Sequence, residues 1–167
     1  MLMHNKSIGV IGLGYVGLPI AIGLGEKVDV KGFDINEERV QELSKNYDRG
    51  TQISSSEFLK SKNFKPFSDA KHLKDCDVYI ISVPTPVNDN NKPDLSYLQS
   101  ASKIVAKMLT PGNLVIFEST VYPGATEDIC IPILEEISEL TEGKNFDVGY
   151  SPERINPGDP NTSLQSV

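Results

Sequence analysis

Three glycines carry the first chemical signal of the chain. Gly12, Gly14 and Gly17 form a GxGxxG pattern directly after the short apolar run Ser7–Ile11. In such a turn the first glycine permits a tight bend, the second lets a pyrophosphate approach the backbone, and the third lets the following helix pack closely. The positive end of that helix then faces the phosphates. Glycine-rich turns are common, so the pattern gains its meaning from what surrounds it.

A carboxylate lies where a dinucleotide fold needs one. Asp34 ends the next apolar run, about 20 residues after the glycine turn, where a carboxylate contacts the adenosine ribose hydroxyls. Because a carboxylate repels a ribose phosphate, Asp34 favours NAD over NADP. Arg39 leaves the alternative open, since a nearby arginine can hold that phosphate. Both residues would also suit plain surface positions, at a strand end and on a helix.

Two further loops follow apolar runs and are expected to reach the cofactor. Val83, Pro84 and Thr85 begin a proline-stiffened loop whose backbone would line the ribose and nicotinamide, unless it is only a rigid turn. Ser119 and Thr120 form a hydroxyl pair directly after a buried run, well placed to touch cofactor or substrate. The alternative for this pair is that one hydroxyl caps the next helix.

A third loop, Ser151–Asp159, holds a carboxylate beside a guanidinium. Glu153 is a candidate general base or water-positioning group. Arg154 is a candidate partner for a substrate anion, and Asn156 is grouped with it as a substrate contact. A salt bridge or a solvated loop is the alternative, and the local sequence alone favours that alternative.

Strands alternate with helices along the whole chain. Six strands are expected, at Ser7–Ile11, Val28–Phe33, Phe64–Phe67, Asp77–Val83, Asn113–Glu118 and Phe146–Tyr150. Helices are expected at Leu18–Gly25, Asn36–Asn46, Glu57–Leu59, Asp94–Leu109 with Asp94 as its N-cap, and Thr126–Leu140 with a kink at Pro132. The stretch Pro84–Pro93 is expected to be an irregular loop, because its prolines oppose regular structure. This alternation predicts an α/β fold of the Rossmann type, a doubly wound and mostly parallel sheet with helices on both faces.

Composition narrows the class of protein. The chain has 167 residues and a net charge of −7, so we expect no nucleic-acid partner. Cys76 and Cys130 form no CxxC pair, and with only two histidines present we expect no metal site or disulfide framework. No apolar run is long enough to span a membrane, and the first residues lack the pattern of a secretory signal. We therefore expect a cytoplasmic protein without membrane contact.

Six motifs in this order resemble the UDP-glucose/GDP-mannose dehydrogenase family: GLGYVGLP, FDIN, VPTPV, PDL, ESTVYPG and SPERINPGD. The resemblance runs from about Ile8 to Asp159 and is greatest to the bacterial branch acting on UDP-N-acetylhexosamines in capsule and O-antigen synthesis. It implies NAD as the cofactor. The expected cofactor contacts, from the turn, the strand-end carboxylate region and the two loops, are Gly12, Gly14, Tyr15, Val16, Gly17, Asp34, Arg39, Val83, Pro84, Thr85, Ser119 and Thr120.

The resemblance also implies a reaction. Enzymes of this family oxidise the terminal alcohol of the sugar to a carboxylate with two NAD molecules, through a cysteine-bound thioester. Thr120 matches the threonine that helps to hold a catalytic water, and Glu153 matches the glutamate implicated in thioester hydrolysis. Pro157 stands where the UDP-glucose branch carries a second glutamate, which favours a UDP-N-acetylhexosamine substrate.

The family's catalytic cysteine lies in a motif that this chain lacks, and we expect Cys76 and Cys130 to be small core residues. Residues 1–167 are therefore expected to be the NAD-binding portion of a longer enzyme that forms a homodimer, inactive without the remaining domains. A stand-alone NAD-binding regulatory module is the main alternative. Another type of two-domain dehydrogenase is a third reading, which the motifs ESTVYPG and SPERINPGD disfavour.

Overall fold

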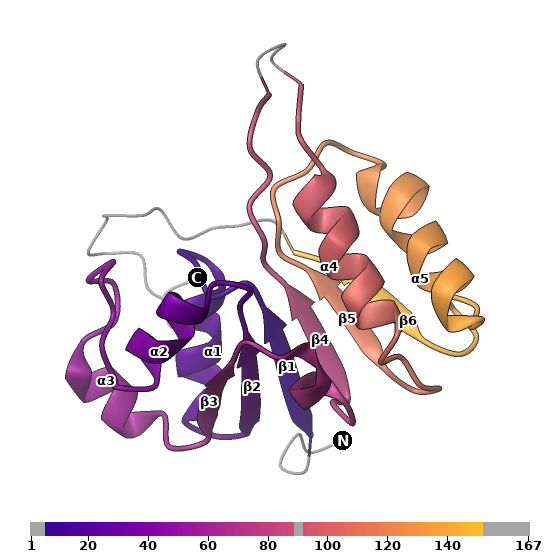
Figure 1. Cartoon of the computed structure of the whole chain (residues 1–167). Helices are drawn as coiled ribbons and strands as arrows, with labels where there is room; N and C mark the ends of the chain where they lie inside the picture. Colours follow the sequence, from indigo (N-terminus) through magenta and orange to yellow (C-terminus); the bar gives the residue numbers. More distant parts are fainter. Residues whose placement is uncertain (1–5, 89–91, 152–167) are drawn as a thin grey trace.

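The computed structural model describes residues 6–88 and 92–151, which fold around one six-stranded sheet. The strands are β1 (Ser7–Ile11), β2 (Asp29–Phe33), β3 (Phe64–Phe67), β4 (Val78–Ile81), β5 (Leu114–Phe117) and β6 (Asp147–Tyr150). Their spatial order is β3-β2-β1-β4-β5-β6, and every neighbouring pair is parallel (Figure 1). The predicted fold class is confirmed; β1 and β3 have the predicted bounds, and the other four strands are shorter than predicted.

The helices occupy the connections between the strands. They are α1 (Gly17–Gly25), α2 (Glu37–Leu43), α3 (Ser55–Lys60), α4 (Ser96–Ala106) and α5 (Ile131–Ser138). A 3₁₀ helix at Ala70–Leu73 was not predicted; it begins after Asp69, whose side chain accepts a hydrogen bond from the backbone of Lys71 at 3.0 Å. The expectation for Asp94 needs a correction, because the N-cap of α4 is Leu95. Asp94 precedes it and still accepts a hydrogen bond from the Ser96 amide at 2.9 Å.

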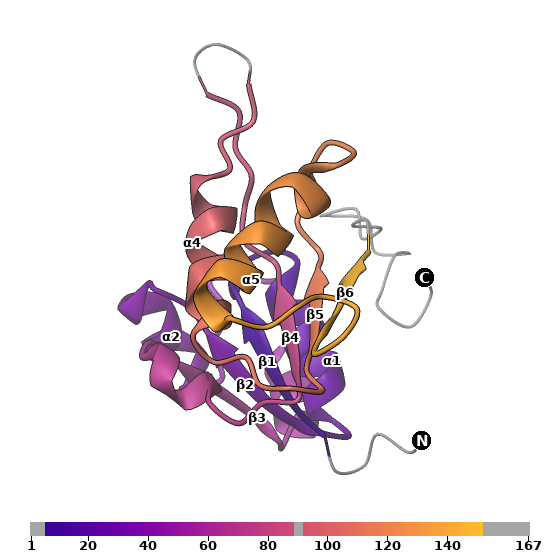
Figure 2. The same cartoon turned by 90° about the vertical axis from the view of Figure 1, so that its right-hand side faces the viewer.

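Successive side chains of a strand point to opposite faces, and each face of the sheet carries its own apolar core. Ile8 and Val10 of β1 pack in one cluster with the buried apolar residues of α1, with Leu43 of α2 and with Phe58 of α3. Tyr79 and Ile81 of β4 pack with those of α4 and α5. Figure 2 shows α4 and α5 on one side of the central strands and α1 on the other. The two-layered core is what the doubly wound pattern requires.

The strand order changes direction between β1 and β4. The chain runs outward from β1 to β2 and β3, then returns to place β4 on the other side of β1. Because all the strands are parallel, the loops after β1, β2, β4 and β5 meet at one edge of the sheet. Ligands of open α/β sheets bind in the crevice outside this edge, at the point of reversal.

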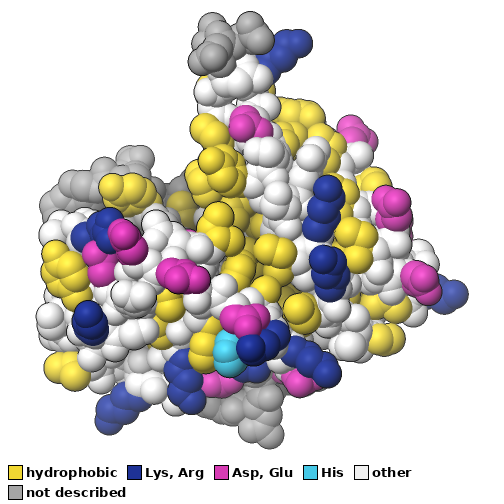
Figure 3. Space-filling view, in the orientation of Figure 1, with side chains coloured by type: hydrophobic (Ala, Val, Ile, Leu, Met, Phe, Trp, Pro, Cys, Tyr) yellow, Lys and Arg dark blue, Asp and Glu magenta, His cyan; other side chains and the backbone are white. Residues whose placement is uncertain are grey.

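A paired arm projects from the sheet after β4 (Figure 1). Val87 and Pro93 form an antiparallel bridge, and the amides of Asn88 and Asp94 donate to the carbonyls of Lys92 and Pro86 at 2.8 and 2.7 Å. The described residues of this stretch contain no helix or strand, so the predicted loop is confirmed, and the isolated bridge between its two sides was not predicted. Pro86 tolerates this pairing because it contributes its carbonyl, while Asn88 and Asp94 supply the amides. In Figure 3, hydrophobic side chains gather at the foot of the arm and between the two halves of the molecule.

The predicted helix Thr126–Leu140 is built in two parts. Thr126–Cys130 is a π-helical segment, and α5 continues from it as an α-helix. Pro132 lies in the first turn of α5, where its missing amide costs least. The proline therefore marks the change between the two helix types.

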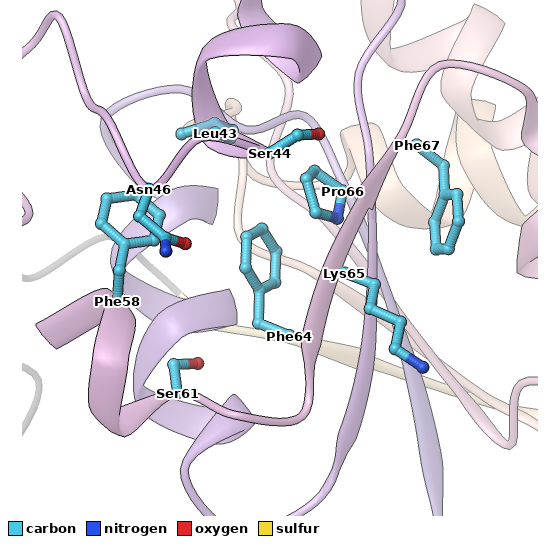
Figure 4. A pocket seen from close by; sticks show the side chains of 9 residues that line it. All are labelled: Leu43, Ser44, Asn46, Phe58, Ser61, Phe64, Lys65, Pro66 and Phe67. Atoms are coloured by element: carbon cyan, nitrogen blue, oxygen red, sulfur yellow. The ribbon is translucent and has the colours of Figure 1, made fainter. Parts of the chain in front are cut away.

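A hollow of about 350 Å³ lies between α2, α3 and β3 (Figure 4). In the view of Figure 4 the ring of Phe64 stands between Phe58 and Pro66. Ser61 also lines this hollow. Its hydroxyl is the one buried polar side-chain group in the described part of the chain that has no hydrogen-bond partner.

Candidate functional site

The glycine turn begins where β1 ends, against the loop that follows β4. Gly12 has φ of +92°, which a side chain rarely permits, and its amide donates to the carbonyl of Phe33 at 2.8 Å. A Cβ at Gly12 would lie 3.0 Å from the carbonyl oxygen of Ser82. The first glycine is therefore required both by its backbone angle and by the close approach of the neighbouring strand.

The second and third glycines differ in what surrounds them. A Cβ at Gly14 would have no atom within 4 Å, whereas one at Gly17 would lie 1.9 Å from the carbonyl oxygen of Gly12. Gly17 thus allows α1 to start directly against the turn, and Gly14 leaves the backbone open on its outer side. The open backbone and the positive end of the α1 dipole fit a diphosphate group.

Asp34 lies beside this turn, as its place at the end of β2 requires. Its Oδ2 accepts a hydrogen bond from the amide of Leu13 at 2.9 Å, and its Oδ1 accepts one from the amide of Asn36 at 2.9 Å. Together with Gly14 and Tyr15, these residues line a hollow of about 270 Å³. A carboxylate at this position can receive hydrogen bonds from ribose hydroxyls.

Arg39 reaches the same hollow from α2, and its guanidinium is engaged by the protein. Its Nε donates to the carbonyl of Leu13 at 3.1 Å, and its Nη1 donates to Oδ1 of Asp48 at 2.7 Å. The Arg39 side chain is 15% exposed and that of Asp48 is fully buried. The arginine is therefore not a surface charge, as the alternative reading held, but part of a partly buried ion pair.

Sequence reasoning missed the loop after α2 that completes the hollow. Arg49, Gly50 and Gln52 line it. Asp48 holds this loop, because its carboxylate accepts hydrogen bonds from the amides of Gly50, Gln52 and Ile53 at 2.9 to 3.1 Å. The detectable signal was the Asp48-x-Gly50 spacing, which is typical of a turn closed by an aspartate side chain.

Burial works to raise the pKa of Asp48. The hydrogen bonds from Arg39 and from the amides of Ile53 and Gly50 outweigh it, so the pKa of Asp48 lies below its ordinary value. The group is ionised at neutral pH and pairs with Arg39 as a full charge.

The two loops that follow β4 and β5 are tied to each other. The hydroxyl of Ser119 donates to the carbonyl of Val83 at 2.7 Å, and the hydroxyl of Thr85 donates to the carbonyl of Thr120. Ala125 is the N-cap of the next helical segment, and no side chain caps it, so the capping alternative for Ser119 and Thr120 is wrong. The four predicted residues thus come together at one place on the crevice.

Ser82 connects these loops to the glycine turn, and sequence reasoning did not find it. Its buried hydroxyl lies within hydrogen-bond reach of the carbonyl oxygens of Ile11 and Gly12, at 3.1 and 2.9 Å. Ser82 therefore fixes the turn after β1 to the start of the loop after β4. A lone serine at a strand end gives no sequence signal for this contact.

From residue 152 on, the third predicted loop lies outside the described residues. Glu153, Arg154 and Asn156 belong to it, and their expected roles rest on the sequence. The described chain ends at Ser151, whose amide donates to the carbonyl of Phe117 at 3.0 Å. The loop therefore starts at the same edge of the sheet as the others.

Both cysteines are core residues, as predicted. Cys76 and Cys130 are free and buried. Burial raises the pKa of both thiols, that of Cys130 to about 11. A thiol with a raised pKa is a poor nucleophile at neutral pH.

Across residues 6–88 and 92–151, no cluster of three or more histidine, cysteine or acidic side chains has the arrangement of a metal site. No helix within these ranges has the length and apolar character needed to cross a membrane.

Comparison with known proteins places the chain in a defined group. The family profile described as "UDP-glucose/GDP-mannose dehydrogenase family, NAD binding domain" matches residues 6–166. Protein CapL of Staphylococcus aureus is 53% identical, over 98% of this chain and 38% of that protein. UDP-N-acetyl-D-glucosamine 6-dehydrogenase of Pseudomonas aeruginosa is 44% identical, over 99% and 39%.

Solved structures agree with the sequence relatives. The UDP-D-ManNAc dehydrogenase from Pyrococcus horikoshii superimposes with a TM-score of 0.82 at 38% identity, over 91% of this chain and 37% of that one. The ternary complex of GDP-mannose dehydrogenase from Pseudomonas aeruginosa gives 0.82 at 26% identity, over 90% and 36%. The chain spans about two fifths of the length of the curated relatives it matches.

Proposed function

The chain belongs to the UDP-glucose/GDP-mannose dehydrogenase family as its NAD-binding domain, and we propose that it serves a UDP-N-acetylhexosamine 6-dehydrogenase. The whole enzyme would oxidise the terminal alcohol of the sugar to a carboxylate, in the synthesis of capsule or O-antigen polysaccharide. The relatives named above include a UDP-N-acetylhexosamine 6-dehydrogenase, which supports this substrate class. Pro157, in place of a second glutamate, supports it independently.

The observation that carries the proposal is the pairing of the open glycine turn with the Asp34 carboxylate. The backbone at Gly14 is unobstructed. The preceding residue, Leu13, donates its amide hydrogen bond to the carboxylate of Asp34. We infer that the diphosphate of NAD lies against the turn, between Gly12 and Gly17, with Tyr15 and Val16 beside it. Asp34 would receive hydrogen bonds from the adenosine ribose.

Bound NAD supplies the hydride acceptor. We assign the nicotinamide end to the two tied loops, with Val83, Pro84 and Thr85 on one side and Ser119 and Thr120 on the other. The hydrogen bonds between these loops hold their backbones in fixed positions. A rigid wall orients the reacting ring and limits the approach of water.

Thr120 and Glu153 are proposed to act on the later, hydrolytic part of the reaction. Thr120 would hold a water, and Glu153 would take a proton from it. Arg154 and Asn156 are proposed substrate contacts. Because the nucleophilic cysteine of the family has no counterpart in residues 1–167, we propose that this part binds NAD and turns over no substrate by itself.

A stand-alone NAD-binding regulatory module is the second candidate. The two proposals share the cofactor site and differ in whether the coding frame continues into a cysteine-bearing domain. For the enzyme we propose a cytoplasmic homodimer, and light scattering of the complete protein measures that state.

The deciding experiment is a substrate screen of the complete protein. UDP-N-acetylglucosamine, UDP-N-acetylmannosamine, UDP-N-acetylgalactosamine and UDP-glucose are offered with NAD, and NADH absorbance is followed. We expect NADH from at least one N-acetylhexosamine substrate. NADH from UDP-glucose alone, or none from any of the four, would contradict the proposal.

A further inference from the structure

The hollow beside the glycine turn contains two arginines, yet their charges are already matched by acids of the protein. Arg39 pairs with Asp48 at 2.7 Å and lies 3.8 Å from Glu42. Arg49 pairs with Glu42 at 2.7 Å and with Glu38 at 3.6 Å. Two unpaired arginines beside the adenosine ribose would favour the binding of a ribose phosphate. Their pairing with acids should therefore affect which of the two cofactors binds.

The two pairs differ in how firmly they hold. Arg49 is 51% exposed, and water and salt screen its attraction to the glutamates. The carboxylate of Asp48 is fully buried and accepts three backbone amides besides the guanidinium. If Arg39 turned away, Asp48 would keep a buried charge without its cation, which is strongly unfavourable. Arg39 is therefore the firmly held cation.

Arg39 also connects Asp48 to the glycine turn. Its Nε donates to the carbonyl of Leu13, while the amide of the same residue donates to Asp34. Both polar groups of the Leu13 backbone are thus fixed by charged side chains immediately before Gly14. The position of the turn therefore depends on the hydrogen bonds that connect Asp48 to Arg39 and Arg39 to Leu13.

We propose that Asp48 is a positioning residue that makes the site selective for NAD over NADP, by holding the Arg39 guanidinium away from the ribose 2′ position. The inference rests on the proposed NAD-binding function and adds the origin of its selectivity. With Arg39 held by Asp48, a 2′-phosphate would meet the Asp34 carboxylate without the Arg39 guanidinium to offset it. The loop carrying Arg49, Gly50 and Gln52 closes the same hollow through the other bonds of Asp48.

The test compares the dissociation constants of NAD and NADP by calorimetry on the 167-residue chain. Asp48→Asn keeps the size of the side chain and one oxygen acceptor but removes the charge that holds Arg39. We expect the ratio of the NADP constant to the NAD constant to fall about tenfold or more, because the released guanidinium can form a charge-assisted bond to phosphate. Asp69→Asn, the same change on an exposed loop without a residue in the hollow, is expected to leave the ratio unchanged.

A general loss of packing would weaken both cofactors together, so the ratio separates selectivity from structural damage. An unchanged ratio in folded Asp48→Asn overturns the inference and leaves the proposed function intact. Absence of NAD binding by the unmodified chain overturns both. If Asp48→Asn does not fold, Arg39→Lys decides. In this variant Asp48 still pairs with the lysine, so the ratio of the NADP constant to the NAD constant should be unchanged. A gain in NADP affinity would overturn the inference.

Discussion

Two alanine substitutions in the glycine turn should separate binding from folding. Gly14→Ala adds a methyl group that meets no atom within 4 Å, and Gly14 is not among the glycines with positive φ. The free energy of unfolding should therefore change by less than about 1 kcal/mol. The same methyl group would occupy the space that we assign to the diphosphate.

The expected loss of affinity follows from the contact that is blocked. A hydrogen bond from a backbone amide to a charged group contributes about 1.5–3 kcal/mol. Since about 1.4 kcal/mol corresponds to a tenfold change, Gly14→Ala should weaken NAD binding by about 10- to 100-fold.

Gly17→Ala should act on the fold. Its Cβ would lie 1.9 Å from the carbonyl oxygen of Gly12 and 2.3 Å from the hydroxyl of Ser82. The hydroxyl can rotate, but the carbonyl is backbone and can be relieved only by opening the turn. We expect a cost of about 3 kcal/mol, at the upper end of overpacking effects. For a chain of this size that lowers the Tm by about 6–12 °C.

Calorimetry with NAD and thermal denaturation of both variants measure the two effects. If Gly14→Ala keeps an unchanged Tm and binds NAD as tightly as the unmodified chain, the reasoning is refuted, because the diphosphate then does not approach this backbone. A Gly17→Ala variant as stable as the unmodified chain would show that the turn is not packed as described.

Three further predictions concern stability and reactivity. Ser61→Ala should leave the Tm unchanged or raise it, since it removes a buried hydroxyl without a partner; a clear fall in thermal denaturation would contradict this. The lowered pKa of Asp48 means that its ionised form stabilises the fold. That contribution is complete above the ordinary value of 3.8 and is lost as pH falls through the lower folded value, so the Tm of the unmodified chain should fall more steeply below about pH 4 than that of Asp48→Asn. Cys76 and Cys130 should resist a thiol reagent until the chain unfolds, because burial raises the pKa of both; rapid labelling of the folded chain would count against it.

The parts of the site that were predicted depend on short stretches of sequence. The glycine spacing, the strand before it and Asp34 at the next strand end are all local features, and a parallel sheet brings the ends of β1 and β2 together without further information. The same reasoning expected the loops after β4 and β5 to reach the cofactor, and these neighbouring parallel strands end at the same edge of the sheet. The hydroxyl contacts between those loops, by contrast, were not predictable in detail.

The parts that were missed depend on contacts between distant residues. Asp48 binds both Arg39 and the amides of the loop that follows it, and Ser82, directly after β4, contacts Gly12, which lies 70 residues earlier. Neither residue has a distinctive neighbour pattern beyond a possible turn. The pairing in the arm after β4 was also missed, because only the folded backbone shows that Pro86 contributes a carbonyl and Asp94 the amide.

The amino-acid sequence by itself determined the alternation of strands and helices, the glycine turn and the strand-end carboxylate, because backbone angles and apolar periodicity act over a few residues. Only the tertiary structure decided which polar groups satisfy one another in the crevice. Arg39 has several possible acids nearby in sequence, and burial selects Asp48 among them, since a desolvated carboxylate must find its partners within the fold. That selection turns a surface arginine of the sequence into a fixed part of the candidate cofactor site.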